Sequence, residues 1–127
     1  RVYHHTAPIN LYYGLREALR LVATEGIDRS WQRHQENVEY LWSNLESIGL
    51  KMHVEYQYRL PTLTTVCIPD GVDGKAVARQ LLTEHNIEIG GGLGELAGKV
   101  WRVGLMGYNS RQDSVDRLIV ALEKVLK

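Results

Sequence analysis

The sequence predicts an α+β protein, in which long helices precede a small, mainly antiparallel sheet that carries helices on one face. Three observations lead to this prediction. Residues 11–48 repeat apolar side chains at helical spacing with only a short break. From residue 51 the pattern changes to short runs rich in β-branched residues, separated by turn signals. The order of elements from there is β-β-α-β-β-α, which suits a layer of helices packed on a sheet.

Two helices form the first part of the chain. The first covers residues 11–25 and ends at Gly26, a residue type common just after a helix C-terminus. The second starts after Asp28 or Ser30, either of which can cap it, and ends at Gly49. Its expected apolar face consists of Trp31, Val38, Leu41, Trp42, Leu45 and Ile48.

Four later segments have the composition or the alternation of strands, and two shorter helices separate or follow them. The expected strands are residues 51–56, 62–68, 87–89 and 100–105. Asp73 can cap a helix that runs to His85. Ser110 with Asp113 resembles a capping box at the start of the last helix.

Composition excludes several classes of protein. The chain has 127 residues, 44% of them hydrophobic and 24% charged, as in ordinary globular domains. Its 15 basic and 15 acidic residues balance without a basic stripe, so we expect no nucleic-acid partner. No apolar run approaches the roughly 20 residues that span a bilayer, and nothing resembles a signal peptide. The single cysteine, Cys67, lies in an apolar run and is expected to be a small buried hydrophobe.

Arg102 is the clearest candidate for a binding residue. In a strand it lies on the face opposite Trp101, Val103 and Leu105. An arginine inside an apolar strand needs partners for its five donors. A small carboxylate suits its fork, because two parallel N–H···O bonds form at once. The alternatives are an internal salt bridge to Asp or Glu, or a side chain that reaches solvent.

A glycine cluster, residues 90–94, precedes this strand. Gly92, Gly94 and Ala97 match the dinucleotide-binding pattern G-x-G-x-x-A, but a strand-like segment follows where that motif requires a helix. We therefore set dinucleotide binding aside. A flexible loop near a binding cleft and a plain structural turn both remain open.

The chain opens with Tyr3, His4, His5 and Thr6. Adjacent histidines in an extended segment point apart and chelate one metal poorly, so we expect no metal site. The hydroxyls of Tyr3 and Thr6 have the chemistry to donate to a phosphate.

No nucleophile system is evident in the sequence. The remaining histidines, which lack an obvious Ser or Cys partner, are His34, His53 and His85. Of the lysines, only Lys99 beside the glycine cluster is arguable as a Schiff-base residue, which needs a desolvated site. On pattern alone Lys99 stays open, and the other lysines are expected to be surface residues.

Several segments together resemble one family. In chain order they are YHHT-x-P, LRE, RLPT-x-TT, IEI-x-GGLG, GKV-x-R-x-GL-x-G-x-N and SVDRLIVAL. In this combination the whole chain resembles the alanine–glyoxylate (serine–pyruvate) aminotransferases of the fold-type I pyridoxal-phosphate class. The resemblance implies the carboxy-terminal portion of a transferase that moves an amino group from alanine or serine to glyoxylate or pyruvate.

The resemblance also implies pyridoxal 5'-phosphate as cofactor, a homodimer, and small amino acid and 2-oxo acid substrates. Arg102 matches the family's arginine that holds the substrate carboxylate. Tyr3 and Thr6 match residues that contact the cofactor phosphate of the neighbouring subunit. The family's catalytic lysine matches no residue here. We therefore expect this chain, which begins abruptly at Arg1, to be an inactive fragment.

In domain terms, the resemblance implies that residues 1–27 are the end of the large cofactor domain with an interdomain helix. Residues 28–127 would then form the C-terminal small domain. Two alternatives are a 3-hydroxykynurenine transaminase of the same family, and a non-catalytic module that binds a small acid or dimerises. The implied compartment is the peroxisome for an animal protein, and otherwise the mitochondrion or the cytoplasm.

Overall fold

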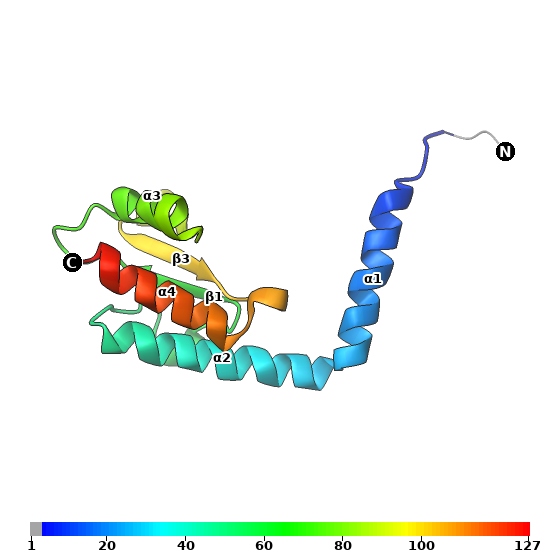
Figure 1. Cartoon of the computed structure of the whole chain (residues 1–127), viewed down its shortest axis with the longest axis horizontal. Coiled ribbons are helices and arrows are strands. Elements are labelled where there is room, and N and C mark those ends of the chain that lie inside the picture. The colour runs from blue at the N-terminus through cyan, green and yellow to red at the C-terminus, as the bar shows by residue number, and fades with distance from the viewer. Residues whose placement is uncertain (1–3) are drawn as a thin grey trace. The chain divides into compact units, whose positions relative to one another are not determined.

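The computed structural model describes residues 4–127, so Tyr3 lies outside the described residues. The chain divides into two units, Arg1–Gln32 and Arg33–Lys127. The first unit contains α1 (Ile9–Glu25) and the first residues of α2 (Ile27–Ser47), and both helices are labelled in Figure 1. Gly26 separates them with a φ of 86°, a left-handed conformation that favours glycine. Both predicted helices, and the stop at Gly26, are confirmed. The predicted cap of the second helix is wrong, because α2 begins at Ile27 and Asp28 and Ser30 lie inside it. Trp31, which was expected on its apolar face, is exposed.

Helix α1 exposes many large apolar side chains. None of its residues is buried, and its large apolar side chains are all exposed in the described chain. They are Ile9, Leu11, Tyr12, Tyr13, Leu15, Leu19, Leu21 and Val22. The apolar residues whose helical spacing predicted this helix were Leu11, Leu15, Ala18, Leu19, Val22 and Ala23. All of them lie in α1, but none is buried within the described residues.

The second unit is an α+β layer, as the sequence predicts. Its antiparallel sheet has the order β1-β3-β2, with β1 at Leu63–Cys67, β3 at Val100–Gly104 and β2 at Gly90–Gly91. Helices α2, α3 (Gly74–His85) and α4 (Gln112–Val125) share one hydrophobic core with this sheet. Asp73 caps α3 as expected, because its carboxylate accepts hydrogen bonds from the backbone N–H groups of Lys75 and Ala76.

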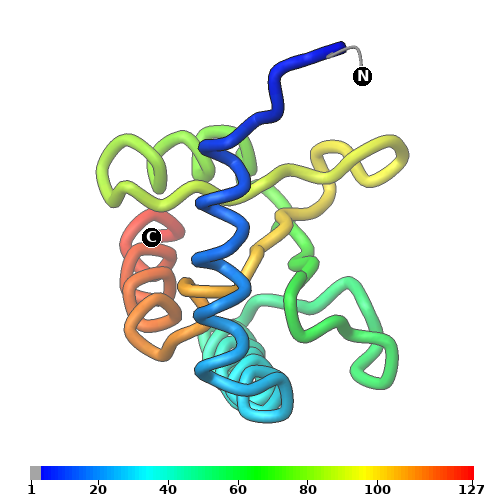
Figure 2. The backbone as a smooth tube through the Cα atoms, turned by 90° about the vertical axis from the view of Figure 1, so that its right-hand side faces the viewer, coloured from blue at the N-terminus to red at the C-terminus, as the bar shows by residue number. Residues whose placement is uncertain are grey.

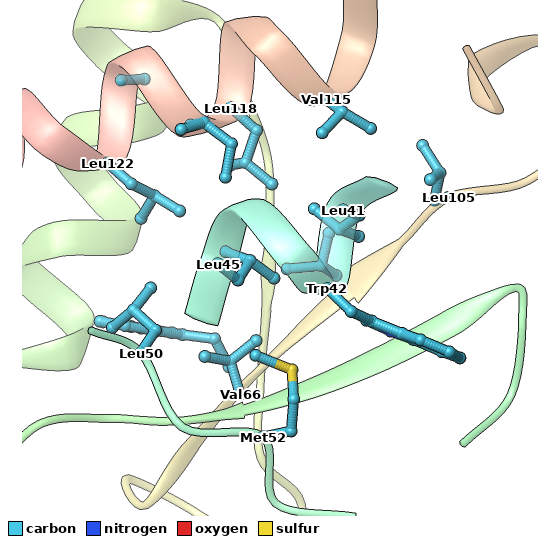
Figure 3. Packing of buried hydrophobic residues seen from close by; sticks show 14 of the residues in the cluster. Leu41, Trp42, Leu45, Leu50, Met52, Val66, Leu105, Val115, Leu118 and Leu122 are labelled. Atoms are coloured by element: carbon cyan, nitrogen blue, oxygen red, sulfur yellow. The ribbon is translucent and has the colours of Figure 1, made fainter. Parts of the chain in front are cut away.

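The core lies between the sheet and the helices (Figure 3). Its fully buried members include Leu41 and Leu45 from α2, Val66 from β1, and Val115 and Leu122 from α4. Each fully buried aliphatic side chain of this kind contributes about 1.5–3 kcal/mol relative to exposure.

A hydrogen bond also joins α2 and α4 across the edge of this core. The Tyr40 hydroxyl donates to Asp116 at 2.8 Å, and this bond together with the nearby negative charge raises the pKa of Tyr40. Because the raised pKa belongs to the folded state, the contact stabilises the fold at neutral pH. This stabilisation is lost as the pH rises through the pKa of Tyr40 in the folded state.

A buried polar contact fixes α2 to β1. The Trp42 indole N–H donates to the Thr64 hydroxyl at 2.8 Å, and both residues are buried. The neighbouring Thr65 side chain lies on the opposite face of the strand, and its hydroxyl has no hydrogen-bond partner within residues 4–127.

We expect Thr64→Val to lower the free energy of unfolding by about 1–3 kcal/mol, because it leaves a buried indole donor without an acceptor. Thr65→Val is the matched control and should leave stability nearly unchanged. Denaturant unfolding of the two variants measures the difference, and equal stabilities would contradict the role given to this contact.

The predicted strand at residues 51–56 is wrong. Only Met52 forms a bridge to β1, through hydrogen bonds that join His53 N–H to the Thr65 carbonyl and Cys67 N–H to the Lys51 carbonyl. The chain then turns away, because the Arg59 side chain donates to the Val54 carbonyl at 3.0 Å.

Arg59 also pairs with Glu46 of α2 at 3.0 Å, and its guanidinium lies 5.2 Å from the centre of the Trp42 ring. These contacts hold the following segment against the helix as a 3₁₀ turn, Tyr56–Tyr58, where a strand was expected. From residue 51 the strands and helices therefore read β-α-β-β-α.

The predicted strand at residues 87–89 is also displaced. Pairing with β3 begins only at Gly90, which lies opposite Arg102. Asn86 ends α3 in a left-handed conformation, and Ile87 and Ile89 then pack against the core instead of entering the sheet. Cys67 is half-buried, so the expectation of a buried cysteine is met only in part.

The capping box at Ser110 is wrong. Helix α4 starts at Gln112 without a side-chain cap, and Ser110 is fully buried. The Ser110 carbonyl instead accepts hydrogen bonds from Asn37 at 2.8 Å and from Arg33 at 2.9 Å, both on α2. Contacts to a distant helix therefore outweigh the local capping pattern.

Among the described residues, none of the helices has the combination of length and apolarity that a membrane span requires.

Candidate functional site

Strand β3 separates a core face from an open face, as its alternation predicts. Trp101 and Val103 are buried on the core side, and the Trp101 indole donates to the Gly74 carbonyl at 2.9 Å. Arg102 lies on the other face, between Thr65 of β1 and Gly90 of β2 in the register of the sheet. The buried residues of α2, α3 and α4 pack with the core side of the strand, where Trp101 and Val103 lie.

The Arg102 guanidinium is held by backbone and has a free end. Its Nε–H donates to the Gly91 carbonyl at 2.7 Å, and the side chain is half-buried. Within residues 4–127, Nη1 and Nη2 have no hydrogen-bond or ion-pair partner. The internal salt bridge considered from the sequence is therefore absent from the described chain. A side chain with two unpaired, parallel donors has the geometry to bind a carboxylate.

The glycine cluster forms a hairpin that leads into β3. Gly92 N–H donates to the Val100 carbonyl at 3.0 Å, which continues the pairing of β2 with β3. The loop contains a three-residue 3₁₀ turn, Gly94–Leu96, and returns directly to β3. Since no helix opens after these glycines, the structure agrees with setting dinucleotide binding aside. The loop follows β2, the edge strand of the sheet, and is drawn in yellow in Figure 2.

A groove of about 470 Å³ lies between this hairpin and the start of α3. Its walls include Gly91, Gly92, Gly98 and Trp101. Arg102 does not line it, because the arginine points from the opposite face of β3. The loop therefore borders a groove, but that groove is separate from the free end of the arginine.

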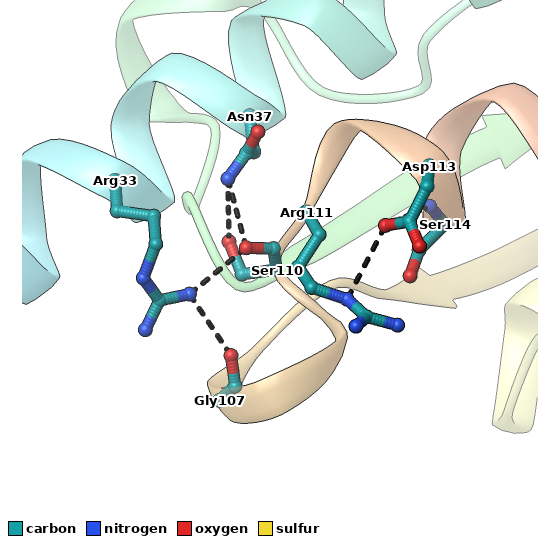
Figure 4. Close-up of polar contacts among 7 residues, drawn as sticks. All are labelled: Arg33, Asn37, Gly107, Ser110, Arg111, Asp113 and Ser114. Carbon is teal, nitrogen blue, oxygen red and sulfur yellow. Dashed lines mark hydrogen bonds and ion pairs between the residues drawn. The ribbon is translucent and has the colours of Figure 1, made fainter. Parts of the chain in front are cut away.

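The turn after β3 is fixed by polar side chains of α2 (Figure 4). Arg33 donates to the carbonyls of Gly107 and Ser110, and the His34 Nε2 accepts from the Gly107 N–H at 2.9 Å. Asn37 is buried and donates to the Ser110 carbonyl. Sequence reasoning missed these residues. The one available signal was Asn37, a polar residue next to the apolar stripe of its helix.

In the first unit, His4, His5 and Thr6 are exposed. The two histidine rings contact each other, with centroids 4.3 Å apart, so they do not point apart as an extended segment would require. The described residues contain no group of three or more His, Cys, Asp or Glu side chains arranged to hold a metal ion. Thr6 exposes a hydroxyl that has no hydrogen-bond partner among the described residues.

The lysines are Lys51, Lys75, Lys99, Lys124 and Lys127, and all of them are exposed. A Schiff-base lysine requires a desolvated site that lowers its pKa. The surroundings of these lysines do not provide one in the described chain.

Residues 1–118 match the model of the aminotransferase class-V family, so the chain belongs to that family. Within it, the chain is similar to alanine–glyoxylate aminotransferases, and the resemblance seen in the sequence is confirmed. It is 44% identical to the alanine–glyoxylate aminotransferase of Felis catus over 128 residues, which cover 100% of this chain and 31% of the relative.

Solved structures agree with this assignment. The alanine–glyoxylate aminotransferase of Nostoc sp. superimposes with a TM-score of 0.96 at 80% identity, covering 100% of this chain and 34% of that chain. The ureidoglycine–glyoxylate aminotransferase of Bacillus subtilis superimposes with a TM-score of 0.94 at 39% identity. This match covers 97% of the present chain and 32% of the Bacillus subtilis chain. The present chain thus spans about a third of the length of these proteins.

Proposed function

We propose that this chain is the carboxy-terminal portion of a transaminase that moves an amino group from alanine or serine to glyoxylate or pyruvate. The observation that carries the proposal is the free end of Arg102. Amino acid donors and 2-oxo acid acceptors both carry a carboxylate next to the reacting carbon. One arginine that binds this group can therefore orient the substrate in both halves of the reaction.

The contacts of Arg102 define how it would bind. With Nε occupied by the Gly91 carbonyl, the carboxylate is approached through Nη1 and Nη2, which donate in parallel. Because the guanidinium has no acidic partner in the described chain, its charge is available to the substrate. The arginine therefore binds and orients the substrate carboxylate.

The proposed cofactor is pyridoxal 5'-phosphate. The exposed hydroxyl of Thr6 fits a phosphate oxygen, and Tyr3 is proposed beside it, in both cases toward the cofactor of the neighbouring subunit of a homodimer. When bound, the cofactor supplies an electron sink for the carbon that exchanges its amino group. We place the catalytic lysine outside these 127 residues, and the exposure of every lysine in the chain supports this placement.

Thr6→Val in the whole protein is expected to raise the dissociation constant of pyridoxal phosphate by roughly tenfold, the effect of losing one hydrogen bond to a charged group. Tyr3→Phe should act in the same direction. At saturating cofactor, KM for the amino donor should stay unchanged. Retention of cofactor through dialysis measures the effect, and wild-type retention in both variants would remove these residues from the phosphate site.

The domain division follows from the same proposal. Residues 1–27 would belong with the end of the large domain, and residues 28–127 would form the small domain. The exposed apolar side chains of α1 support this division, because apolar helix surface of this kind is usually covered by a packing partner. The compartment stays a prediction: the peroxisome for an animal protein, and otherwise the mitochondrion or cytoplasm.

The decisive experiment measures amino transfer by the whole protein. Alanine and serine are tested as donors and glyoxylate and pyruvate as acceptors, with ureidoglycine and 3-hydroxykynurenine as competing donors. Transfer from alanine or serine to glyoxylate is expected. Transfer from ureidoglycine or 3-hydroxykynurenine, without transfer from alanine or serine, would overturn the proposed substrate class. The similarities to known proteins do not favour the 3-hydroxykynurenine alternative.

The isolated 127-residue chain should be inactive even with added pyridoxal phosphate. Borohydride treatment should then fix no stoichiometric label on any one lysine. Stoichiometric labelling of Lys99 would place the anchoring lysine inside the chain and contradict the proposed division of the active site.

A further inference from the structure

The two glycines of β2 lie directly against the Arg102 guanidinium. Gly90 is the register partner of Arg102 on the edge strand of the sheet. A Cβ built on Gly90 would lie 3.3 Å from Nη2 and 3.6 Å from both Cζ and Nε of Arg102. The guanidinium therefore occupies the space above Gly90 that a side chain would otherwise fill.

The Gly91 carbonyl fixes the rotation of the same group. It accepts the Nε–H at 2.7 Å, a short bond for N–H···O. A backbone carbonyl is uncharged, so unlike a carboxylate it orients the guanidinium without neutralising its charge. The free Nη1 and Nη2 then keep both their donors and the full attraction for an anion.

We propose that Gly90 is a positioning residue for substrate binding, and that β2 is a platform that pre-orients Arg102. A long, flexible arginine loses side-chain entropy when it binds a ligand, and a platform that fixes it beforehand reduces that loss. The absence of a side chain at Gly90 sets the height of the guanidinium above the sheet. The Gly91 carbonyl sets which two nitrogens face the substrate. This inference rests on the proposed role of Arg102 as the carboxylate-binding residue.

Gly90→Val in the whole protein tests the platform. The added side chain fits strand geometry but has to displace the guanidinium, so KM for the amino donor and for the oxo acid should rise about tenfold. The kcat, the cofactor content and the melting temperature should stay near the wild-type values. Gly90→Ala, whose single methyl group requires a shift of only a few tenths of an ångström, should give a smaller rise of about two- to threefold.

Gly104→Val is the matched control on the same face of the sheet. A Cβ there meets only the terminal methyl of Met106, at an ordinary contact distance of 3.5 Å. It adds the same side chain to the same strand face as Arg102 without entering the space of the guanidinium. Its KM values should therefore equal those of the wild type.

A double-mutant cycle with Arg102→Lys separates positioning through the arginine from a general effect on structure. In the Arg102→Lys background, Gly90→Val should no longer raise KM, because lysine has neither the Nε contact nor the planar fork. An equal rise in both backgrounds would overturn the inference. So would an unchanged KM in both Gly90 variants when Arg102→Lys alone raises it. If Arg102→Lys itself leaves KM unchanged, the proposed function fails, whatever the Gly90 variants do.

Discussion

Replacing Arg102 by lysine in the whole protein is expected to raise KM for both the amino donor and the oxo acid by about tenfold or more. Lysine keeps the charge but loses the planar pair of donors that matches a carboxylate. Hydrogen bonds to charged groups contribute about 1.5–3 kcal/mol, and about 1.4 kcal/mol corresponds to a tenfold change in binding. Arg102→Gln, which also removes the charge, should raise KM further.

The measurement is a set of steady-state constants for both half-reactions, with cofactor absorbance recorded on the same samples. Cofactor content should be unchanged, because Arg102 is assigned to the substrate and not to pyridoxal phosphate. Arg79→Lys, an exposed residue on α3, is a matched control and should behave like the wild type. Unchanged KM values for both substrates in Arg102→Lys would reject the carboxylate role.

The sequence predicted the parts of the fold that depend on periodicity. The apolar spacing in residues 11–48 corresponds to α1 and α2, and the alternation after residue 100 corresponds to β3. Prediction failed where partners far along the chain decide the structure. Residues 51–56 alternate like a strand, yet Arg59 turns them away after a single bridge at Met52.

The same distinction applies to the candidate site. Alternation along β3 was enough to place Arg102 on the face opposite the core, since that depends only on neighbouring residues. Its partner, the Gly91 carbonyl, depends on how an intervening loop closes and was not foreseeable from the pattern. The contacts of Arg33, His34 and Asn37 with the turn after β3 join residues more than 70 positions apart, and no local signal announces them.

The second large expected effect is that of Gly92→Ala, in the loop that joins β2 to β3. A Cβ on Gly92 would lie 1.9 Å from the Leu96 carbonyl oxygen and 2.5 Å from its carbon, both backbone atoms. It would also lie 2.9 Å from Cγ2 of Val100, which is buried. Gly92 does not have a positive φ, so the obstacle is contact with its neighbours and not backbone conformation.

We expect Gly92→Ala to destabilise the hairpin by about 2–3 kcal/mol, the range seen when an extra group is forced into a packed site. The loop backbone has to move, because Leu96 and Lys99 are joined by a backbone hydrogen bond of 3.0 Å across it. The melting temperature of the whole protein should fall by roughly 5 °C. Gly91→Ala is the stability control, since a Cβ there meets nothing within 4 Å.

Gly92→Ala should also affect substrate binding, which connects the two predictions. Gly92 continues the pairing that places Gly90 and Gly91 beside Arg102, so a displaced loop moves the carbonyl that orients the guanidinium. KM should therefore rise in Gly92→Ala, as it does in Arg102→Lys. The melting temperature should fall in Gly92→Ala but not in Arg102→Lys. Equal melting temperatures for Gly92→Ala and Gly91→Ala would show that the loop tolerates the added methyl group. The tight hairpin would then not be what holds the arginine in place.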